Sequence, residues 1–256
     1  MRKKNGKILG TVVFILLISW ILYLTFFTAR KFNKGDIKMI EITGNNLLNE
    51  SDYLMFTKLN DLSFNRDIPL SVIKDRFEKH PYISRADVEA EGDTADRIIL
   101  SEKKMKAVIL NGNEAYFITE DFQILPIFPY TKEADLLVIS NAQDTSQIIP
   151  LSYLKNSDII DAFKIIDAAK KTNMNIFKRI TEINLNRGGD ITMNFSGINT
   201  KFIFGRGEEA RKMIYLEIMW DGVVDGNDLI RDSDYIDLRF ANEVYIKTAE
   251  TAGLIE

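Results

Sequence analysis

The sequence predicts an α+β protein in three parts: an N-terminal transmembrane helix, a small β-α-α-β-β unit, and a mixed domain built on an antiparallel β-sheet with two helices. Three observations lead to this fold class. Residues 8–29 carry no charged side chain. Residues 37–106 show strand and helix patterns in the order of the small unit. Residues 107–256 are rich in alternating apolar and polar positions, which two helical patterns interrupt.

The apolar run at residues 8–29 is long enough for a membrane helix, because roughly 20 residues cross the hydrocarbon core of a bilayer. A cleaved signal peptide is the first alternative, but its apolar region spans about 7–15 residues and ends at small residues. Phe27 stands where such a cleavage site needs a small residue. A buried core helix is the second alternative, and a run that is apolar on all sides at the start of the chain disfavours it.

Basic residues flank this run on both sides, so the charge bias that sets membrane orientation is modest. A seven-residue head gives no reason for translocation. We therefore expect residues 1–7 in the cytoplasm and a single span of the cytoplasmic (inner) membrane over residues 8–29. The rest of the chain is then expected on the periplasmic or extracellular side.

The body after this span is acidic. The 256-residue chain carries a net charge of −4, and its first 34 residues hold seven Lys and Arg and no acid, so the remainder carries −11. Such a body binds nucleic acid poorly, because the phosphates repel it. The chain contains no cysteine, which excludes disulfides and thiolate metal sites.

The small unit begins with an alternating strand at residues 37–43, which Gly44-Asn45-Asn46 ends. A short helix is expected after Asn49, and a second over residues 69–79, with proline in its first turn. Two strands joined by a polar turn complete the unit, at residues 83–91 and 97–102.

The larger domain contains a strong hairpin signal, in which alternating runs at residues 180–186 and 191–195 flank Gly188-Gly189. Ser157 predicts the cap of a helix through Lys171, with Ile159, Phe163, Ile166 and Ala169 on one face. A second helix is expected over residues 208–224, with Met213, Leu216, Trp220 and Val223 facing inward. The other expected elements are strands at residues 115–118, 123–125, 201–204, 235–240 and 244–247.

No catalytic constellation stands out. The one histidine, His80, ends a predicted helix, where favourable interaction with the helix C-terminus accounts for it. Gly205-Arg206-Gly207 opens a helix and could hold an anion, but a turn that uses glycine freedom is the favoured interpretation. The acidic pair Glu120-Asp121 fits a solvated turn. We expect no catalytic residue, no metal, no cofactor and no small-molecule substrate.

Several phrases, in order and spacing, resemble the FtsQ/DivIB family of bacterial cell-division proteins. Two departures from the family pattern stand out: Phe122 replaces a usual turn glycine, and Met105-Lys106 stands where a proline is common. The phrases that carry the resemblance are Ile40-Glu41-Ile42-Thr43-Gly44-Asn45, His80-Pro81-Tyr82-Ile83, Arg97-Ile98-Ile99-Leu100-Ser101-Glu102-Lys103, Tyr116-Phe117-Ile118-Thr119-Glu120-Asp121, Phe204-Gly205-Arg206-Gly207-Glu208, Tyr235-Ile236-Asp237-Leu238-Arg239-Phe240 and Val244-Tyr245-Ile246-Lys247.

The resemblance implies a POTRA domain over residues 37–106 and a β domain over residues 107–256 that ends in a partner-binding strand. It implies a non-enzymatic bitopic scaffold that recruits and links division proteins at the septum, with FtsB/DivIC-like and FtsL-like single-pass proteins as partners. A partner strand would add to the open terminal strand by β-augmentation. The partner-binding residues that follow from the resemblance are Arg239, Phe240, Asn242, Val244, Tyr245 and Ile246, with Arg206 as a further candidate.

Two other functions compete with this one. A different POTRA-bearing, membrane-anchored secretion or assembly chaperone is the first. An outer-membrane member of that class would need a barrel of roughly 8 or more strands after the POTRA units, and residues 107–256, with two helices, leave no room for it. An anchored external hydrolase is the second, and the missing general base argues against it.

Overall fold

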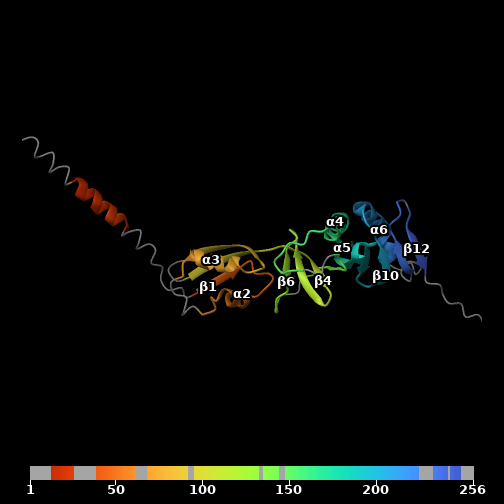
Figure 1. Ribbon diagram of the computed structural model, residues 1–256, viewed down its shortest axis with the longest axis horizontal. Coiled ribbons are helices and arrows are strands. Elements are labelled where there is room, and N and C mark those ends of the chain that lie inside the picture. The colour runs from red at the N-terminus through yellow and green to blue at the C-terminus, as the bar shows by residue number, and fades with distance from the viewer. Residues whose placement is uncertain are drawn as a thin grey trace, which may run out of the picture. The chain divides into compact units, whose positions relative to one another are not determined.

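The computed structural model describes residues 13–25, 39–61, 68–91, 95–132, 135–143, 148–224, 233–241 and 243–248. The chain divides into two compact units, Met1–Glu102 and Lys103–Glu256 (Figure 1). The sequence places this boundary at Lys106, a few residues later. Each unit is described by itself below.

Residues 13–25 are helical, but within the described ranges no helix is both long and apolar enough to cross a membrane. A span needs roughly 20 residues, and the helix seen here is shorter. This finding contradicts the predicted transmembrane helix over residues 8–29, and with it the single-pass location in the cytoplasmic membrane. The predicted head at residues 1–7 lies outside the described residues.

The first unit has the order β-α-α-β-β. Its elements are β1 (Met39–Thr43), α2 (Glu50–Thr57), α3 (Leu70–Glu78), β2 (Ile83–Glu91) and β3 (Ala95–Glu102). The three strands form one sheet in the order β1-β3-β2, with β1 parallel and β2 antiparallel to β3. This order follows from the sequence, because only residues 92–94 separate β2 from β3 whereas two helices separate β1 from them.

The core of the first unit lies between the sheet and the helices. Ile73 and Phe77, one helical turn apart, are fully buried on α3, whereas Val72, which the apolar pattern places on the same stripe, is exposed. The hydroxyl of Tyr53, on α2, donates a hydrogen bond to Glu102 at the end of β3 (2.5 Å). Burial and this hydrogen bond to a carboxylate raise the pKa of Tyr53. The contact therefore ties α2 to the last strand.

The second unit is built on a nine-stranded sheet in the order β12-β11-β10-β9-β8-β7-β4-β5-β6. Three neighbouring pairs are parallel: β4 with β7, β7 with β8, and β10 with β11. The strands are β4 (Met105–Asn111), β5 (Glu114–Thr119), β6 (Ile124–Pro126), β7 (Val138–Ser140), β8 (Ile180–Asn184), β9 (Thr192–Phe195), β10 (Ile198–Ile203), β11 (Ser233–Asp237) and β12 (Tyr245–Thr248).

The described residues of this unit form three α-helices: α4 (Ser157–Thr172), α5 (Met174–Arg179) and α6 (Glu209–Val224). Helices α4 and α6 pack against each other (Figure 1). Their apolar faces share one core with the sheet, in which Ile166 of α4 and Leu216 of α6 are fully buried. At the start of α4, Asn156 rather than the predicted Ser157 is the cap, because its side chain accepts a hydrogen bond from the Ile159 amide (2.9 Å).

The α+β class is confirmed, but two details of the second unit differ from the prediction. The sheet is mixed rather than antiparallel, and α5 is a third helix. Both differences follow from helices that connect strands of the sheet. Helix α6 joins β10 to β11, and helices α4 and α5 stand between β7 and β8. A strand, a helix and a second strand placed side by side bring the strands together in parallel.

Candidate functional site

The C-terminal strand β12 stands at one end of the nine-stranded sheet. It pairs antiparallel with β11 on one side, with Ile236 opposite Ile246 and Asp237 opposite Tyr245. Within the described part of the chain its other edge has no neighbouring strand. An unpaired strand edge offers backbone N–H and C=O groups to a second chain. The geometry of β12 is therefore that of an open binding edge.

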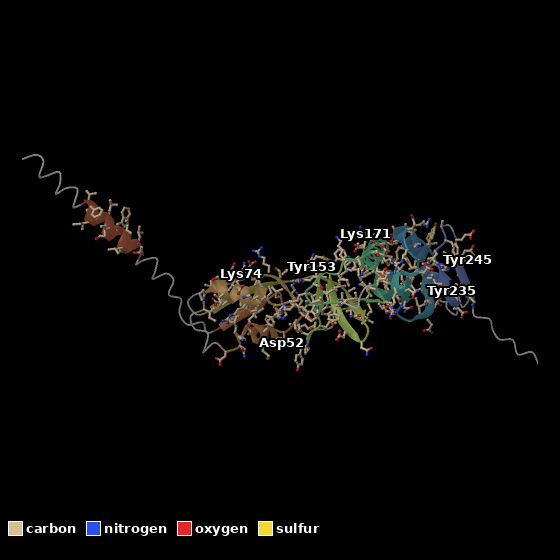
Figure 2. The ribbon with its side chains drawn as sticks, in the orientation of Figure 1. Asp52, Lys74, Tyr153, Lys171, Tyr235 and Tyr245 are labelled. Carbon is tan, nitrogen blue, oxygen red and sulfur yellow. The ribbon has the colours of Figure 1, made fainter. Side chains whose placement is uncertain are left out.

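An aromatic pair lies beside this edge. The rings of Phe240 and Tyr245 meet edge to face, with centroids 4.6 Å apart. Both side chains remain open to solvent, Phe240 at 45% and Tyr245 at 49% exposure, and Figure 2 places Tyr245 near Tyr235 on the last strands. The Tyr245 hydroxyl donates a hydrogen bond to Glu243 (2.6 Å), which raises the pKa of Tyr245. The pair is held in place but not covered.

A shallow apolar groove lies where α6 meets the turn before β12. Its lining comes from both elements, and its volume is about 180 Å³. Ile218 on α6 is 77% exposed, and Ile214, one turn earlier, is also exposed. The Tyr215 hydroxyl donates a hydrogen bond to the Ala241 carbonyl (2.9 Å), which fixes the turn to the helix. The residues that line the groove are Tyr215, Ile218, Met219, Glu243 and Val244.

Arg239 is held by two carboxylates. Its guanidinium donates to both oxygens of Asp237 (2.5 and 2.9 Å) and to Asp190 on the turn before β9 (2.6 Å). Its aliphatic stem lies over Gly205, where an added Cβ would be 2.6 Å from the Arg239 Cγ. The same guanidinium lies 5.9 Å from the centre of the Phe240 ring. Arg239 thus joins the β11 end to the β10–α6 turn.

The electrostatics of Asp237 reflect this arrangement. Burial of Asp237 is the largest influence on its pKa and raises it, but the hydrogen bonds from Arg239 and the charges of Arg239 and Lys212 together outweigh burial. The pKa of Asp237 therefore lies below its ordinary value. The two carboxylates in turn raise the pKa of Arg239. Asp237 and Arg239 are therefore both charged at neutral pH.

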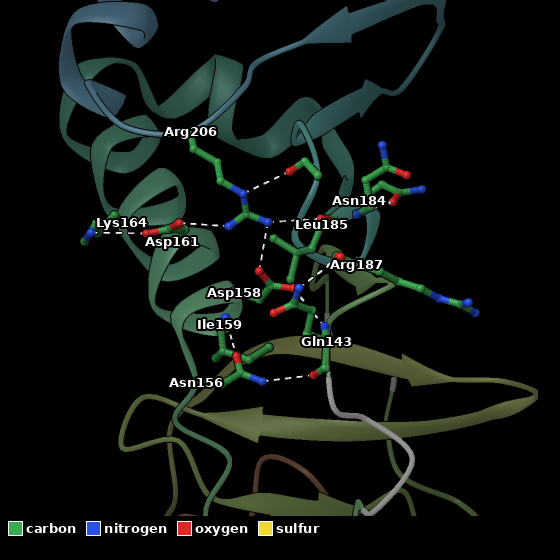
Figure 3. Close-up of polar contacts among 12 residues, drawn as sticks. Gln143, Asn156, Asp158, Ile159, Asp161, Lys164, Asn184, Leu185, Arg187 and Arg206 are labelled. Atoms are coloured by element: carbon green, nitrogen blue, oxygen red, sulfur yellow. Dashed lines mark hydrogen bonds and ion pairs between the residues drawn. The ribbon is translucent and has the colours of Figure 1, made fainter.

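Arg206 lies at the start of the loop before α6 and points into the protein (Figure 3). Its guanidinium donates to Asp158 (2.8 Å) and Asp161 (2.9 Å) of α4, and to the carbonyls of Leu185 (3.1 Å) and Gly189 (2.9 Å). Asp158 is only 1% exposed. A buried carboxylate needs such a partner, so Arg206 has a structural task independent of any partner protein.

Arg206 and Arg239 both contact the turn at Gly189 and Asp190, before β9. Arg206 contacts the Gly189 carbonyl and Arg239 contacts the Asp190 side chain. Lys212 of α6 is buried beneath them and donates a hydrogen bond to the Arg206 carbonyl (3.1 Å). Burial lowers the pKa of Lys212. This network supports the end of β11 that leads into the Phe240 turn.

The structure therefore brings most of the predicted partner-binding residues together at the β12 end of the sheet. Arg239, Phe240, Tyr245 and Ile246 are exposed there, and Val244 is half-buried against α6. Asn242 lies outside the described residues. Arg206 shares a turn with Arg239 but faces α4.

Sequence reasoning missed the α6 side of this region. Met213, Leu216 and Trp220 were expected to face inward and are buried. Ile214 and Ile218 lie on another face and are exposed. The signal was available, because a surface helix with apolar residues outside its buried stripe leaves an apolar face uncovered.

His80, the one histidine, is buried in the first unit among Tyr53, Phe56 and Tyr82. Its Nδ1 accepts a hydrogen bond from the Tyr82 amide (3.1 Å). This is the environment of a core residue.

No family model matches this chain, and no curated protein matches it.

Proposed function

We propose that this chain is a non-enzymatic binding protein of the FtsQ/DivIB type, which links bacterial cell-division proteins by taking a strand of an FtsB/DivIC-like or FtsL-like partner onto β12. The observation that carries the proposal is the open edge of β12 at the end of the nine-stranded sheet. A partner strand there would continue the sheet through main-chain hydrogen bonds.

The side chains around the edge support protein recognition. Aromatic residues and arginine dominate the binding energy of protein interfaces, and Phe240, Tyr245 and Arg239 stand together here. The edge-to-face contact and the two carboxylates fix these side chains before a partner arrives. Less conformational entropy is then lost on binding.

The adjoining groove supports an apolar anchor. Met219 and Val244, the residue just before β12, line it, and Ile246, two positions further along the extended chain, is expected on the same face. A partner strand on β12 would have side chains at alternate positions on this face. One of them could enter the groove, which is sized for a single large side chain.

The test is a binding measurement with the purified full chain and an FtsB/DivIC-type protein from the same genome. Phe240→Ala and Tyr245→Glu should each weaken the complex by about tenfold or more, because each removes an exposed aromatic anchor. Isothermal titration calorimetry measures the loss. Circular dichroism should remain native, because both side chains are open to solvent.

Tyr153→Ala is the matched control, since Tyr153 is an exposed tyrosine beside Gln123, just before β6, at the other end of the sheet. It should bind as the parent does. Equal affinity for the parent, the Phe240 variant and the Tyr245 variant would remove β12 as the binding edge.

A further inference from the structure

Two turns beside β6 place bulky apolar residues where a turn of this kind favours glycine. Residues 128–131 and residues 149–152 each form a turn closed by a hydrogen bond from the fourth amide to the first carbonyl (3.2 and 3.1 Å), with proline second. The third residues are Tyr130 and Leu151, at φ of 65° and 70°. Proline followed by positive φ is the type II turn, whose third position favours glycine.

Phe122 shows what normally compensates for such a backbone. It also has a positive φ, of 70°, but its ring stacks on Phe163 of α4 at 4.7 Å. Tyr130 and Leu151 instead project into solvent, at 82% and 50% exposure. In both cases a strained backbone holds a large apolar side chain outward. Strain of this kind persists where the surrounding structure over-determines the backbone, and it clusters at functional sites.

Both turns lie at one apolar end of the second unit. One turn follows β6 directly, and the other is hydrogen-bonded to Ile124 of β6 through the Leu151 amide (2.7 Å). Residues 127–132 and 149–155 contain two lysines, Lys132 and Lys155, and no acid. The other large apolar side chains exposed on these two segments are Ile127, Ile149 and Tyr153. We call this set, with Tyr130 and Leu151, the turn tips.

The β12 end of the same sheet has a groove that is complementary to the projecting turn tips. The groove beside β12 is concave and apolar, and the charged member of its five lining residues is acidic, Glu243. Asp221, exposed on α6, lies one turn beyond Ile218. Projecting apolar tips with lysines thus match an apolar groove with acids. An anionic lipid surface fits less well, because Glu120 and Asp121 are exposed on the turn before β6 and would be repelled by it.

We infer that the turn tips of one copy dock into the groove beside β12 of a second copy. The contact is heterologous: in a pair, the first copy keeps its groove unused and the second keeps its turn tips unused, so further copies can add and the assembly is an open chain. This self-association goes beyond the proposed function, and turn tips in the groove exclude a partner side chain from it. It uses Tyr130 and Leu151 on one side and Ile218, Met219 and Val244 on the other.

The test is sedimentation of the full chain over a wide range of concentration. The parent should form oligomers that weaken with added salt, because lysines and acids contribute. The tip variant Tyr130→Gly/Leu151→Gly should lower the self-association constant by about tenfold or more, since it loses two apolar anchors. Its melting temperature should be equal or higher, because glycine relieves the positive φ. A merely structural role for these residues would lower it.

The groove variant Ile218→Asp should also stay monomeric. An equal mixture of the tip variant and the groove variant should form a dimer and nothing larger, because only one tip and one groove remain competent. This dimer is the decisive expected result. A parent that is monomeric at every concentration, or a mixture that stays monomeric, overturns the inference.

Vesicles of phosphatidylcholine with phosphatidylglycerol complete the test. Binding of the parent but not of the tip variant, with no self-association, would assign the tips to lipid instead. Failure of self-association can be told apart from failure of the partner binding that the proposed function requires. The tip variant keeps Phe240 and Tyr245 and should bind the partner strand as the parent does, whereas Tyr245→Glu, on the other face of β12 from Val244, should leave self-association intact.

Discussion

Among the described residues of the second unit, three large apolar or aromatic side chains occupy left-handed backbone positions: Phe122, Tyr130 and Leu151. The sequence marks Phe122 as a departure from a glycine pattern, but it does not show what holds the ring there. The structure gives the reason. Phe163 stacks on one side of the Phe122 ring, and the Lys155 ammonium lies 5.0 Å from its centre.

The balance at Phe122 predicts an order of stability. Phe122→Gly relieves a backbone cost of about 1 kcal/mol but loses a stacked pair worth about 1 kcal/mol and the buried part of the ring. Phe122→Ala loses the same contacts and keeps the strain. We expect the parent to be most stable, then glycine, then alanine, with alanine about 1 kcal/mol below glycine. Urea denaturation measures this order, and alanine above glycine would contradict it.

Asp237 predicts a pH dependence. Its pKa is lowered in the folded protein, so its contribution to stability is complete above the ordinary Asp pKa of about 3.9 and is lost as pH falls through the lower folded value. Asp237→Asn should cost about 1 kcal/mol at neutral pH, a modest value because Arg239 is partly open to solvent. The variant should also lose less stability than the parent on acidification.

Thermal unfolding at several pH values tests this prediction. Asp234→Asn is the control, since Asp234 is exposed on the same strand and pairs with Lys247 at 3.6 Å. The Asp234 variant should follow the parent. Parallel curves for the parent and the Asp237 variant would mean that Asp237 contributes nothing to the acid sensitivity.

At the scale of single elements, β12 carries the proposed binding through its backbone. Neighbouring residues of a strand direct their N–H groups to opposite edges. Of Ile246→Pro and Lys247→Pro, one therefore removes an amide that bonds to β11 and the other removes an amide that faces outward.

The outward variant should keep the melting temperature of the parent and lose partner binding by about tenfold or more. The inward variant should lower the melting temperature. Calorimetry and partner titration on both variants give the result. If the variant with native stability also binds normally, the main chain of β12 does not make the contact.

Helix α6 shows how far a sequence pattern reaches at this scale. Its apolar spacing predicts the buried face of Met213, Leu216 and Trp220 correctly. The same spacing cannot show that Ile214 and Ile218 stay uncovered. That depends on which elements pack around the helix, and a local pattern has no information about them.

At the scale of the whole molecule, the two compact units have separate cores. Ile73 in the first unit and Ile183 in the second are both fully buried. Each isoleucine replaced by alanine should cost about 2–5 kcal/mol. We expect each substitution to lower only the transition of its own unit in a calorimetric scan. A single transition that both substitutions shift equally would show that the units unfold together.

The predicted membrane span is the main error at this scale. An uncharged run gave the length expected of a span, but within the described ranges no helix is long and apolar enough. Hydropathy measures composition along the chain. The length of an uncharged run does not by itself set the length of a helix.

The sequence by itself determined the α+β class, the strand pairs joined by short connections, and the buried faces of α4 and α6. These features depend on residues close together in the chain. Only the tertiary structure decided the parallel pairs of the mixed sheet, the setting of Arg206 against α4, and the exposed face of α6 beside β12. Each depends on segments brought together from distant parts of the chain, and such contacts leave no periodic signal in the sequence.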